Sequence, residues 1–269
     1  MRLHGRTVVI TGAGGGIGQA LARRCRAEGA RVAVTDRDEA ALQSLGEELG
    51  EGHLALPADV TDHSQLRDLL ASVEAKLGEV DVFCANAGVA VGGGPVETPD
   101  AVWDQAFGVN VRAHILAVRL LLPGWLERGE GYFVAMASAA GLLTQIGSAP
   151  YSVSKHAAVA FAEWLSVTYG DRGLRVSCIC PMGVRTAMLE GTGSGALTDL
   201  ASRAVRGAGT VLEPDDIADV VCEAIEDERF LVLPHPEVLT FFQRKATDYE
   251  RWLAGMRRLQ RTTEQGEAQ

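Results

Sequence analysis

The chain has 269 residues, of which 47% are hydrophobic and 22% are charged, a balance typical of a folded globular protein rather than a disordered one. Its net charge of −10 and its isoelectric point near 5.1 argue against a general nucleic-acid binder. The length suits one α/β domain with a sizeable core, and no linker or repeat divides it, so we expect a single catalytic domain over residues 1–269.

The cysteines and the apolar segments bear on where the protein acts. Five scattered cysteines form no CxxC pair, which favours free thiols in a reducing compartment over disulfides or a metal site. No uninterrupted apolar run approaches the roughly 18 residues of a membrane span, and the N-terminus lacks a signal-peptide pattern. We therefore expect a cytoplasmic protein that binds no metal and has no membrane span.

Short β-branched segments alternate with longer amphipathic segments along the chain. The pattern predicts strands at residues 7–10, 31–35, 53–57, 80–84, 131–137, 174–180 and 230–233. It predicts helices at residues 17–28, 39–49, 64–77, 101–122, 152–170 and 214–227. Such alternation predicts an α/β fold, a Rossmann-type doubly wound parallel sheet of about seven strands with helices on both faces.

A glycine-rich turn joins the first predicted strand to the first predicted helix. It reads TGAGGGIG over residues 11–18. Glycines permit a tight turn and close approach of the backbone to a pyrophosphate, and the helix N-terminus presents free N–H groups to it. Such a turn alone is a weak signal, but in this position it predicts dinucleotide binding. The candidate residues are Gly12, Gly14, Gly16, Ile17 and Gly18.

Asp36 ends the second predicted strand, eighteen residues beyond Gly18. A carboxylate there would accept hydrogen bonds from the ribose hydroxyls and repel a 2′-phosphate, so we expect NAD as the cofactor rather than NADP. The neighbouring Arg37 complicates this prediction, because a basic side chain could turn toward a phosphate. A solvated turn residue is the simpler interpretation of Arg37, and the glycine turn itself holds no basic residue.

Tyr151 and Lys155 lie four residues apart, and Ser138 lies thirteen residues upstream of Tyr151. On a helix, two residues at that spacing share one face. A cation beside the phenol would lower its pKa from about 10 toward neutral and make tyrosine a usable base. Taken alone, the pair also fits an ordinary helix surface.

Taken together, the motifs resemble the short-chain dehydrogenase/reductase family, in its compact single-domain branch. The resemblance covers roughly residues 5 to 234, and its motifs stand in the family's order. They are TGxxxGxG from Thr11, Asp59-Val60, Asn86-Ala87-Gly88, Asn110, Ser138, Tyr151-x-x-x-Lys155 and the segment from Pro181 to Thr186. This ordered set is far more specific than any one of its members.

The resemblance implies an oxidoreductase in which Tyr151 exchanges a proton with the substrate oxygen. Lys155 would lower the pKa of Tyr151 and hydrogen-bond the nicotinamide ribose, and Ser138 would donate to the substrate oxygen. Asn110 would anchor a water that links Lys155 to solvent. Further cofactor contacts are implied for Asp59, Val60, Asn86, Ala87, Gly88, Pro181, Gly183, Val184 and Thr186.

Met182 stands where the family's Pro-Gly-x-Val-x-Thr segment has glycine. Its side chain either narrows the pocket beside the nicotinamide or packs as a flexible apolar filler. Apolar residues also flank the catalytic positions, and the expected substrate pocket comprises Ala139, Ala140, Leu142, Met182 and Met188. A pocket lined in this way suits an uncharged, hydrophobic secondary alcohol or ketone, although ordinary packing would require the same residues.

Two segments lie outside these motifs. The Gly- and Ala-rich interval 190–209 predicts a substrate lid, with a plain surface loop as the alternative. In the tail, 238–269, apolar residues recur at helical spacing among arginines, which predicts an amphipathic helix with one basic face. That helix would cover the substrate pocket or a neighbouring subunit, and an anionic membrane surface is the alternative.

We therefore expect an NAD-dependent dehydrogenase that acts on a CH–OH group. One alternative is a catalytically silent nucleotide-binding sensor on the same fold, and another is an NADP(H)-dependent carbonyl or 3-oxoacyl reductase. The presence of Asn110, Ser138, Tyr151 and Lys155 argues against the sensor, which has no need of a proton relay. The resemblance also implies a homodimer or homotetramer, with the helices at 101–122 and 152–170 in its interfaces.

Overall fold

A computed structural model describes residues 1–191 and 198–266 of the chain. Within them, seven strands form one sheet in the order β3-β2-β1-β4-β5-β6-β7, and every pairing is parallel. The strands are β1 (Thr7–Thr11), β2 (Arg31–Thr35), β3 (Leu54–Ala55), β4 (Val82–Ala85), β5 (Gly131–Met136), β6 (Leu174–Ile179) and β7 (Leu231–Val232). The predicted doubly wound parallel sheet is confirmed.

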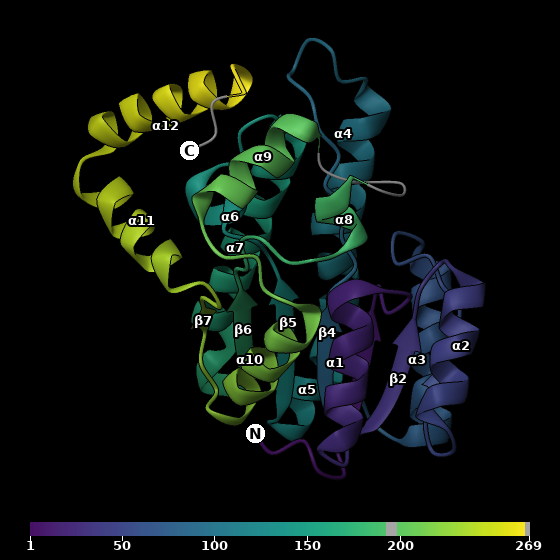
Figure 1. Ribbon diagram of the computed structural model, residues 1–269. Coiled ribbons are helices and arrows are strands. Elements are labelled where there is room, and N and C mark those ends of the chain that lie inside the picture. Colours follow the sequence, from purple (N-terminus) through teal and green to yellow (C-terminus); the bar gives the residue numbers. More distant parts are fainter. Residues whose placement is uncertain (192–197, 267–269) are drawn as a thin grey trace.

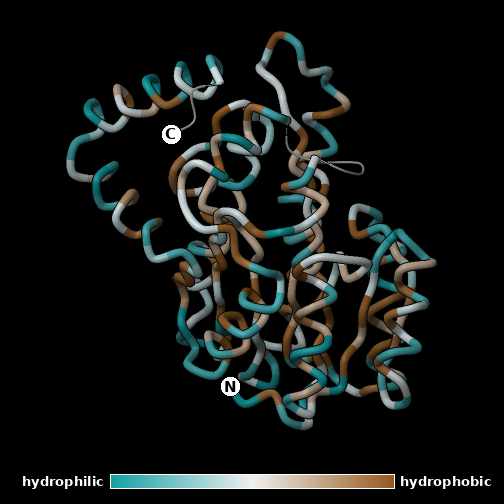
Figure 2. Tube along the Cα trace, in the orientation of Figure 1, coloured by the Kyte–Doolittle hydropathy of each residue, from teal (hydrophilic) through white to brown (hydrophobic). Residues whose placement is uncertain are grey.

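Helices cover both faces of the sheet (Figure 1). One face carries α1 (Gly16–Ala27), α2 (Glu39–Leu49) and α10 (Pro214–Glu226). The other face carries α3 (His63–Leu77), α5 (Ala113–Arg128) and α7 (Ala149–Tyr169). Side chains of a strand alternate between faces, so Val8 and Ile10 join the core under α1 while Val9 joins the core under α3. The strands accordingly form the hydrophobic centre of the trace in Figure 2.

The helical stretch before β5 is more complex than the single helix predicted at 101–122. It consists of α4 (Asp100–Phe107), a π-helical turn η1 (Gly108–Arg112) and α5, which continues through Pro123 to Arg128. By length and composition this is the one stretch of the described chain that could cross a membrane. Half of its most apolar window is buried inside the structure, as in the core helix of a globular protein.

Short elements lie between the later strands and the longer helices. They are α6 (Ala140–Leu143), the 3-10 turn η2 (Gly170–Arg172), α8 (Ala187–Glu190) and α9 (Asp199–Ala208). Of the predicted lid at 190–209, residues 192–197 lie outside the described part, and α9 forms most of the remainder. Whether this segment acts as a lid stays a prediction.

The C-terminal arm, residues 236–264, consists of two helices, α11 (Pro236–Thr247) and α12 (Tyr249–Glu264). The sequence predicted one helix, but the chain breaks at Asp248, whose carboxylate accepts a hydrogen bond from the Arg251 N–H and so caps α12. The arm extends away from the sheet and passes beside α9 (Figure 1). Lys245 Nζ donates to the Leu142 carbonyl, which ties α11 to α6.

Candidate active site

A cleft of about 480 Å³ opens where the strand order reverses, between β1 and β4. In doubly wound sheets this position, outside the carboxyl ends of the strands, is where ligands bind. Most predicted site residues line the cleft. They are Gly12, Gly14, Gly16, Ile17, Asp36, Arg37, Asp59, Val60, Asn86, Ala87, Gly88, Ser138, Tyr151, Lys155, Pro181, Val184 and Thr186.

The glycine turn forms the floor of one end of the cleft. Gly12 has a φ of +67°, and a Cβ on it would lie 2.7 Å from the Cα of Ala87, so a side chain does not fit there. The turn leads into α1, whose N-cap is Gly15. No side chain caps this helix and its first turn holds no acidic residue, which leaves the N–H groups and the positive end of the helix dipole available to an anion. The turn therefore fits a pyrophosphate.

Asp36 is held at the end of β2 by backbone groups. One of its carboxylate oxygens accepts from the Gly14 N–H at 2.9 Å, and the other accepts from the N–H groups of Arg37 and Asp38. The Arg37 guanidinium lies 3.9 Å from the Asp59 carboxylate, also at the edge of the cleft. Asp38 lines the same end, so a ligand there meets three carboxylates and one guanidinium.

Asn86 and Asp59 shape the loops around the nucleotide end. The Asn86 side-chain amide donates to the carbonyls of Thr11 and Gly12, at 2.9 and 3.1 Å, and so fixes the glycine turn to the end of β4. Asp59 accepts from both the N–H and the hydroxyl of Thr61. Asp59 therefore stabilises its own turn while also lining the cleft.

Tyr151, Lys155 and Ser138 meet at the other end of the cleft. Tyr151 and Lys155 lie one turn apart on α7 and are 8% and 3% exposed, while Ser138 follows β5. Lys155 Nζ donates to the Met136 carbonyl at 2.8 Å and lies 5.8 Å from the centre of the Tyr151 ring. The predicted pairing on one helix face is confirmed, with the ammonium over the ring.

The structure adds a second influence, burial, to the expected effect of Lys155 on the pKa of Tyr151. Burial raises the pKa of the Tyr151 phenol, and a hydrogen bond with Ser138 acts in the opposite direction without cancelling it. Burial also lowers the pKa of Lys155 to about 8. Spacing in the sequence predicted the cation beside the phenol, but it could not reveal that both groups lose their hydration.

Three of the predicted residues lie behind the lining of the cleft, namely Gly18, Asn110 and Gly183. Asn110 is fully buried on the π-helical turn, where it exchanges hydrogen bonds with the backbone of Val89 and donates to Ser154 Oγ. Within the described residues it makes no direct hydrogen bond to Lys155. A Cβ on Gly88 would lie 3.4 Å from Asn110 Oδ1 and 3.5 Å from Lys155 Nζ, so both polar atoms flank the same position.

His235 is a site residue that the sequence interpretation assigned only to a rigid turn. Its Nδ1 accepts from the Met182 N–H at 3.1 Å, and its Nε2 donates to the Gly183 carbonyl at 3.0 Å. These two bonds require the neutral tautomer with the proton on Nε2. His235 is 1% exposed and precedes α11, so it connects the segment beside the cleft to the C-terminal arm. Its partners lie 53 residues away, and no local motif marks it.

The expected substrate-pocket residues divide among three environments. Met188 lines the cleft, while Ala139 and Ala140 line a second cavity of about 1000 Å³ beneath the arm. Met182 lines both spaces, which makes it a wall residue rather than a filler. The expectation that Leu142 lines the substrate pocket is corrected. Its side chain packs into the core under α7, and its carbonyl accepts from Lys245 Nζ.

The sequence comparison decides the family. Residues 6–196 match the sequence model described as short chain dehydrogenase. The chain belongs to the short chain dehydrogenase family. The match covers the sheet from β1 to β6 together with the cleft residues, so the predicted resemblance is confirmed.

Relatives of this short chain dehydrogenase act on different alcohols. The chain is 38% identical over 250 residues to a 1-deoxy-11-beta-hydroxypentalenate dehydrogenase of Streptomyces exfoliatus, covering 88% of this chain and 86% of that protein. It is 34% identical over 229 residues to a meso-2,3-butanediol dehydrogenase of Serratia marcescens, covering 85% and 90%. Among solved structures, a short chain dehydrogenase/reductase from Burkholderia phymatum in complex with NAD superposes with a TM-score of 0.84 at 30% identity, covering 93% of this chain and 96% of that one.

Proposed function

We propose that this short chain dehydrogenase transfers hydride between NAD(H) and a secondary alcohol or ketone, with Tyr151 as the general acid and base. The observation that carries the proposal is the meeting of Tyr151, Ser138 and Lys155 in the same cleft as the uncapped glycine turn. The names of the two relatives, both dehydrogenases of hydroxyl-bearing compounds, support the same reaction class.

The cofactor would lie along the cleft. The glycine turn and the N-terminus of α1 would hold its pyrophosphate, Asp36 its adenosine ribose, and Asp59 and Val60 its adenine. Lys155 would hold the nicotinamide ribose, while Pro181, Val184 and Thr186 would hold the carboxamide. When bound, the nicotinamide supplies or accepts the hydride.

The chain's own residues would handle the proton. In the oxidation direction, the Tyr151 oxygen takes the proton of the substrate hydroxyl, and in reduction it returns that proton to the carbonyl oxygen. Ser138 would donate a hydrogen bond to the same substrate oxygen and so fix its position. The buried Lys155 ammonium would stabilise the phenolate electrostatically, because a nearby cation counts for more in a desolvated site.

Asn110 would act as a positioning residue for proton exchange with solvent. Its Oδ1 and Lys155 Nζ flank the space beside Gly88, which suits a bridging water that accepts from the ammonium. The π-helical turn supports this role, because it interrupts the regular helix at Asn110, whose Oδ1 lies beside the cleft residue Gly88.

The direct test is a turnover screen of the purified protein against secondary alcohols and ketones, with NAD(H) and NADP(H) in parallel. We expect alcohol-dependent formation of NADH at 340 nm to exceed formation of NADPH. Cofactor binding without turnover of any compound in a broad panel would favour the sensor on the same fold. A clear preference for NADPH would favour the carbonyl or 3-oxoacyl reductase alternative, in which Arg37 would meet the 2′-phosphate.

We predict that Asp36 governs the choice of cofactor. Asp36→Asn keeps an oxygen for the Gly14 N–H but removes the charge. The ratio of kcat/KM for NAD to kcat/KM for NADP should therefore fall roughly 10- to 100-fold, the range for hydrogen bonds to a charged group. The measurement is kcat/KM for both cofactors with one alcohol. Asp62→Asn, at a carboxylate that caps α3 and does not line the cleft, is the matched control. An unchanged ratio in Asp36→Asn would refute the assignment.

We also propose an oligomeric state and a cellular compartment for this protein. Large apolar side chains are exposed on α4 and α7, including Phe107, Val153, Trp164 and Val167. Such a surface suits burial against a second copy, and we propose a homodimer or homotetramer built on these helices. The five buried free cysteines suit a cytoplasmic location.

A further inference from the structure

The cavity beneath the C-terminal arm continues the cleft that holds Tyr151. The two spaces share Gln145, Met182 and Val205 as lining residues, so a molecule with its reacting carbon beside Tyr151 extends directly into the cavity. The cavity is bounded by α6 and the loop after it, by α9, and by α11 and α12 of the arm. Its volume of about 1000 Å³ exceeds what a small diol would fill.

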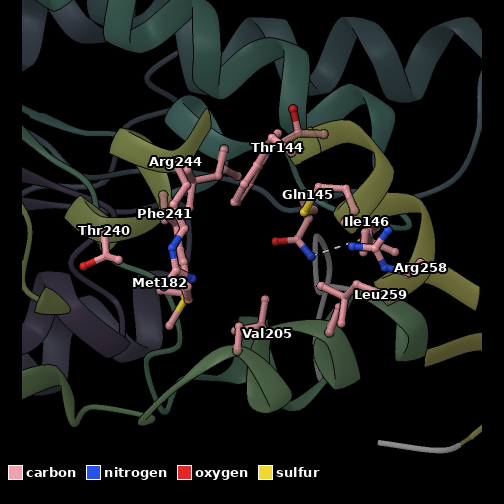
Figure 3. A pocket seen from close by; sticks show the side chains of 18 of the residues that line it. Thr144, Gln145, Ile146, Met182, Val205, Thr240, Phe241, Arg244, Arg258 and Leu259 are labelled. Atoms are coloured by element: carbon pink, nitrogen blue, oxygen red, sulfur yellow. Dashed lines mark hydrogen bonds between the residues drawn. The ribbon is translucent and has the colours of Figure 1, made fainter. Parts of the chain in front are cut away.

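Two kinds of surface face each other across this cavity. The side toward the body of the protein is apolar and includes Ala139, Leu143 and Ile146. The side formed by the arm brings three arginines, Arg244 from α11 together with Arg251 and Arg258 from α12. In Figure 3, Arg244 and Arg258 lie on opposite sides of the opening, with the Gln145 amide between them. Arg251 and Arg258 are seven residues apart and so share one face of α12.

Among residues 1–191 and 198–266 none of these three arginines forms an ion pair with a carboxylate. All three are exposed, and other arginines of the described chain, such as Arg26 and Arg112, also lack an ion pair. What sets the three apart is that they line the same cavity. Among the described residues, Asp248 is the one carboxylate that lines the cavity, and it accepts from the Arg251 backbone N–H and caps α12. The convergence of three guanidinium groups on one cavity, in a chain with 35 acidic and 25 basic residues, makes that cavity a suitable place for an external anion.

We infer that the substrate is an amphiphile, with the reacting secondary alcohol or ketone on an apolar body and a carboxylate or similar anionic group that the arm's arginines bind. This inference rests on the proposed function and refines the expected substrate, which the sequence suggested to be uncharged. Contacts with the body and between its own helices hold the arm in position over the cavity. Lys245 anchors α11 to α6, and the Phe241 and Trp252 rings pack 6.4 Å apart between the two arm helices.

A pair of substrates that differ only in charge tests the inference. One is decanoic acid with a secondary hydroxyl beside its terminal methyl group, and the other is the methyl ester of the same compound. We expect kcat/KM with NAD to favour the acid roughly 10- to 100-fold, the range for charge-assisted hydrogen bonds. Arg258→Gln and Arg251→Gln should each reduce that preference by raising KM for the acid, with the ester unaffected.

The neighbouring Arg257 supplies the matched control, because it is exposed on α12 but does not line the cavity. Arg257→Gln should keep the wild-type preference. Equal kcat/KM for acid and ester in the wild type, or an equal loss of preference in Arg257→Gln and Arg258→Gln, would overturn the inference while leaving the dehydrogenase activity intact.

Binding provides a readout that does not depend on turnover. Decanoate should bind the wild-type protein in calorimetry, and the triple variant Arg244→Gln, Arg251→Gln, Arg258→Gln should weaken that binding at least about tenfold. Decanol should bind both proteins alike. Decanoate binding that is unaffected by the triple variant would overturn the anion site. Arginine-dependent binding without turnover of any alcohol would support the site and instead count against the proposed function.

Discussion

Replacement of Tyr151 by phenylalanine is expected to lower kcat for alcohol oxidation roughly 10²- to 10⁴-fold, the usual contribution of a general acid or base. The substitution removes one oxygen atom from a side chain that is 8% exposed and otherwise keeps the ring that packs with Ala90 and Ala140. The fold and the nucleotide end of the cleft should therefore be unchanged. The measurement is steady-state turnover with NAD and a secondary alcohol, together with NADH binding by fluorescence.

The control for this prediction lies on the same helix. Tyr169 ends α7, and its ring packs against Trp164, far along the helix from the cleft. Tyr169→Phe should keep wild-type turnover, and both variants should bind NADH as the wild type does. If Tyr151→Phe oxidised alcohols at the wild-type rate, the assignment of Tyr151 as the general acid and base would be refuted. A loss of NADH binding in Tyr151→Phe would instead show that the phenol supports the cofactor site.

The sequence predicted the sheet well because parallel strands buried on both faces leave a simple signal. TVVIT and RVAVT each hold three consecutive apolar residues and end in glycine- or aspartate-containing turns, so β1 and β2 stand out from their surroundings. The prediction was poorest where packing rather than periodicity decides. The helix predicted at 101–122 contains a π-helical turn, whose Asn110 exchanges hydrogen bonds with the backbone of Val89, 21 residues away. The break in the tail has a local cause instead, the Asp248 cap on the Arg251 N–H, which the apolar periodicity across it concealed.

The candidate site likewise contains residues that the sequence could reveal and residues that it could not. Motif residues close together in the chain, such as those of the glycine turn and the Tyr151–Lys155 pair, could be identified and brought to one cleft. His235 and the arginines of the arm could not, because their roles depend on contacts across tens of residues or on the shape of a cavity. Spacing in the sequence also gave no sign of the burial that raises the pKa of Tyr151, since the degree of burial is a property of the fold.

Replacement of Lys155 by methionine is expected to lower kcat/KM roughly 10²-fold, because it removes the cation beside Tyr151 and a group that positions the cofactor. It should also change how stability depends on pH. Burial lowers the pKa of Lys155 from 10.5 to about 8, so the folded wild type carries an unfavourable charge below pH 8. That cost, roughly 3 kcal/mol, disappears as the pH rises from about 8 to above 10.5, where the unfolded chain also loses the proton.

The difference in the free energy of unfolding between the wild type and Lys155→Met isolates the contribution of the Lys155 charge. Burial raises the pKa values of the Cys84 thiol and the Tyr132 phenol, so these groups make both proteins less stable as alkaline pH ionises the unfolded chain. Those contributions cancel when the free energy of unfolding of Lys155→Met is subtracted from that of the wild type. The difference should shift in favour of the wild type between pH 7 and pH 10.5. Lys76→Met, which removes an exposed ammonium, controls for net charge. Parallel stability curves for the wild type and Lys155→Met would mean that the Lys155 ammonium is hydrated rather than buried, which would also remove the physical basis for its action on Tyr151.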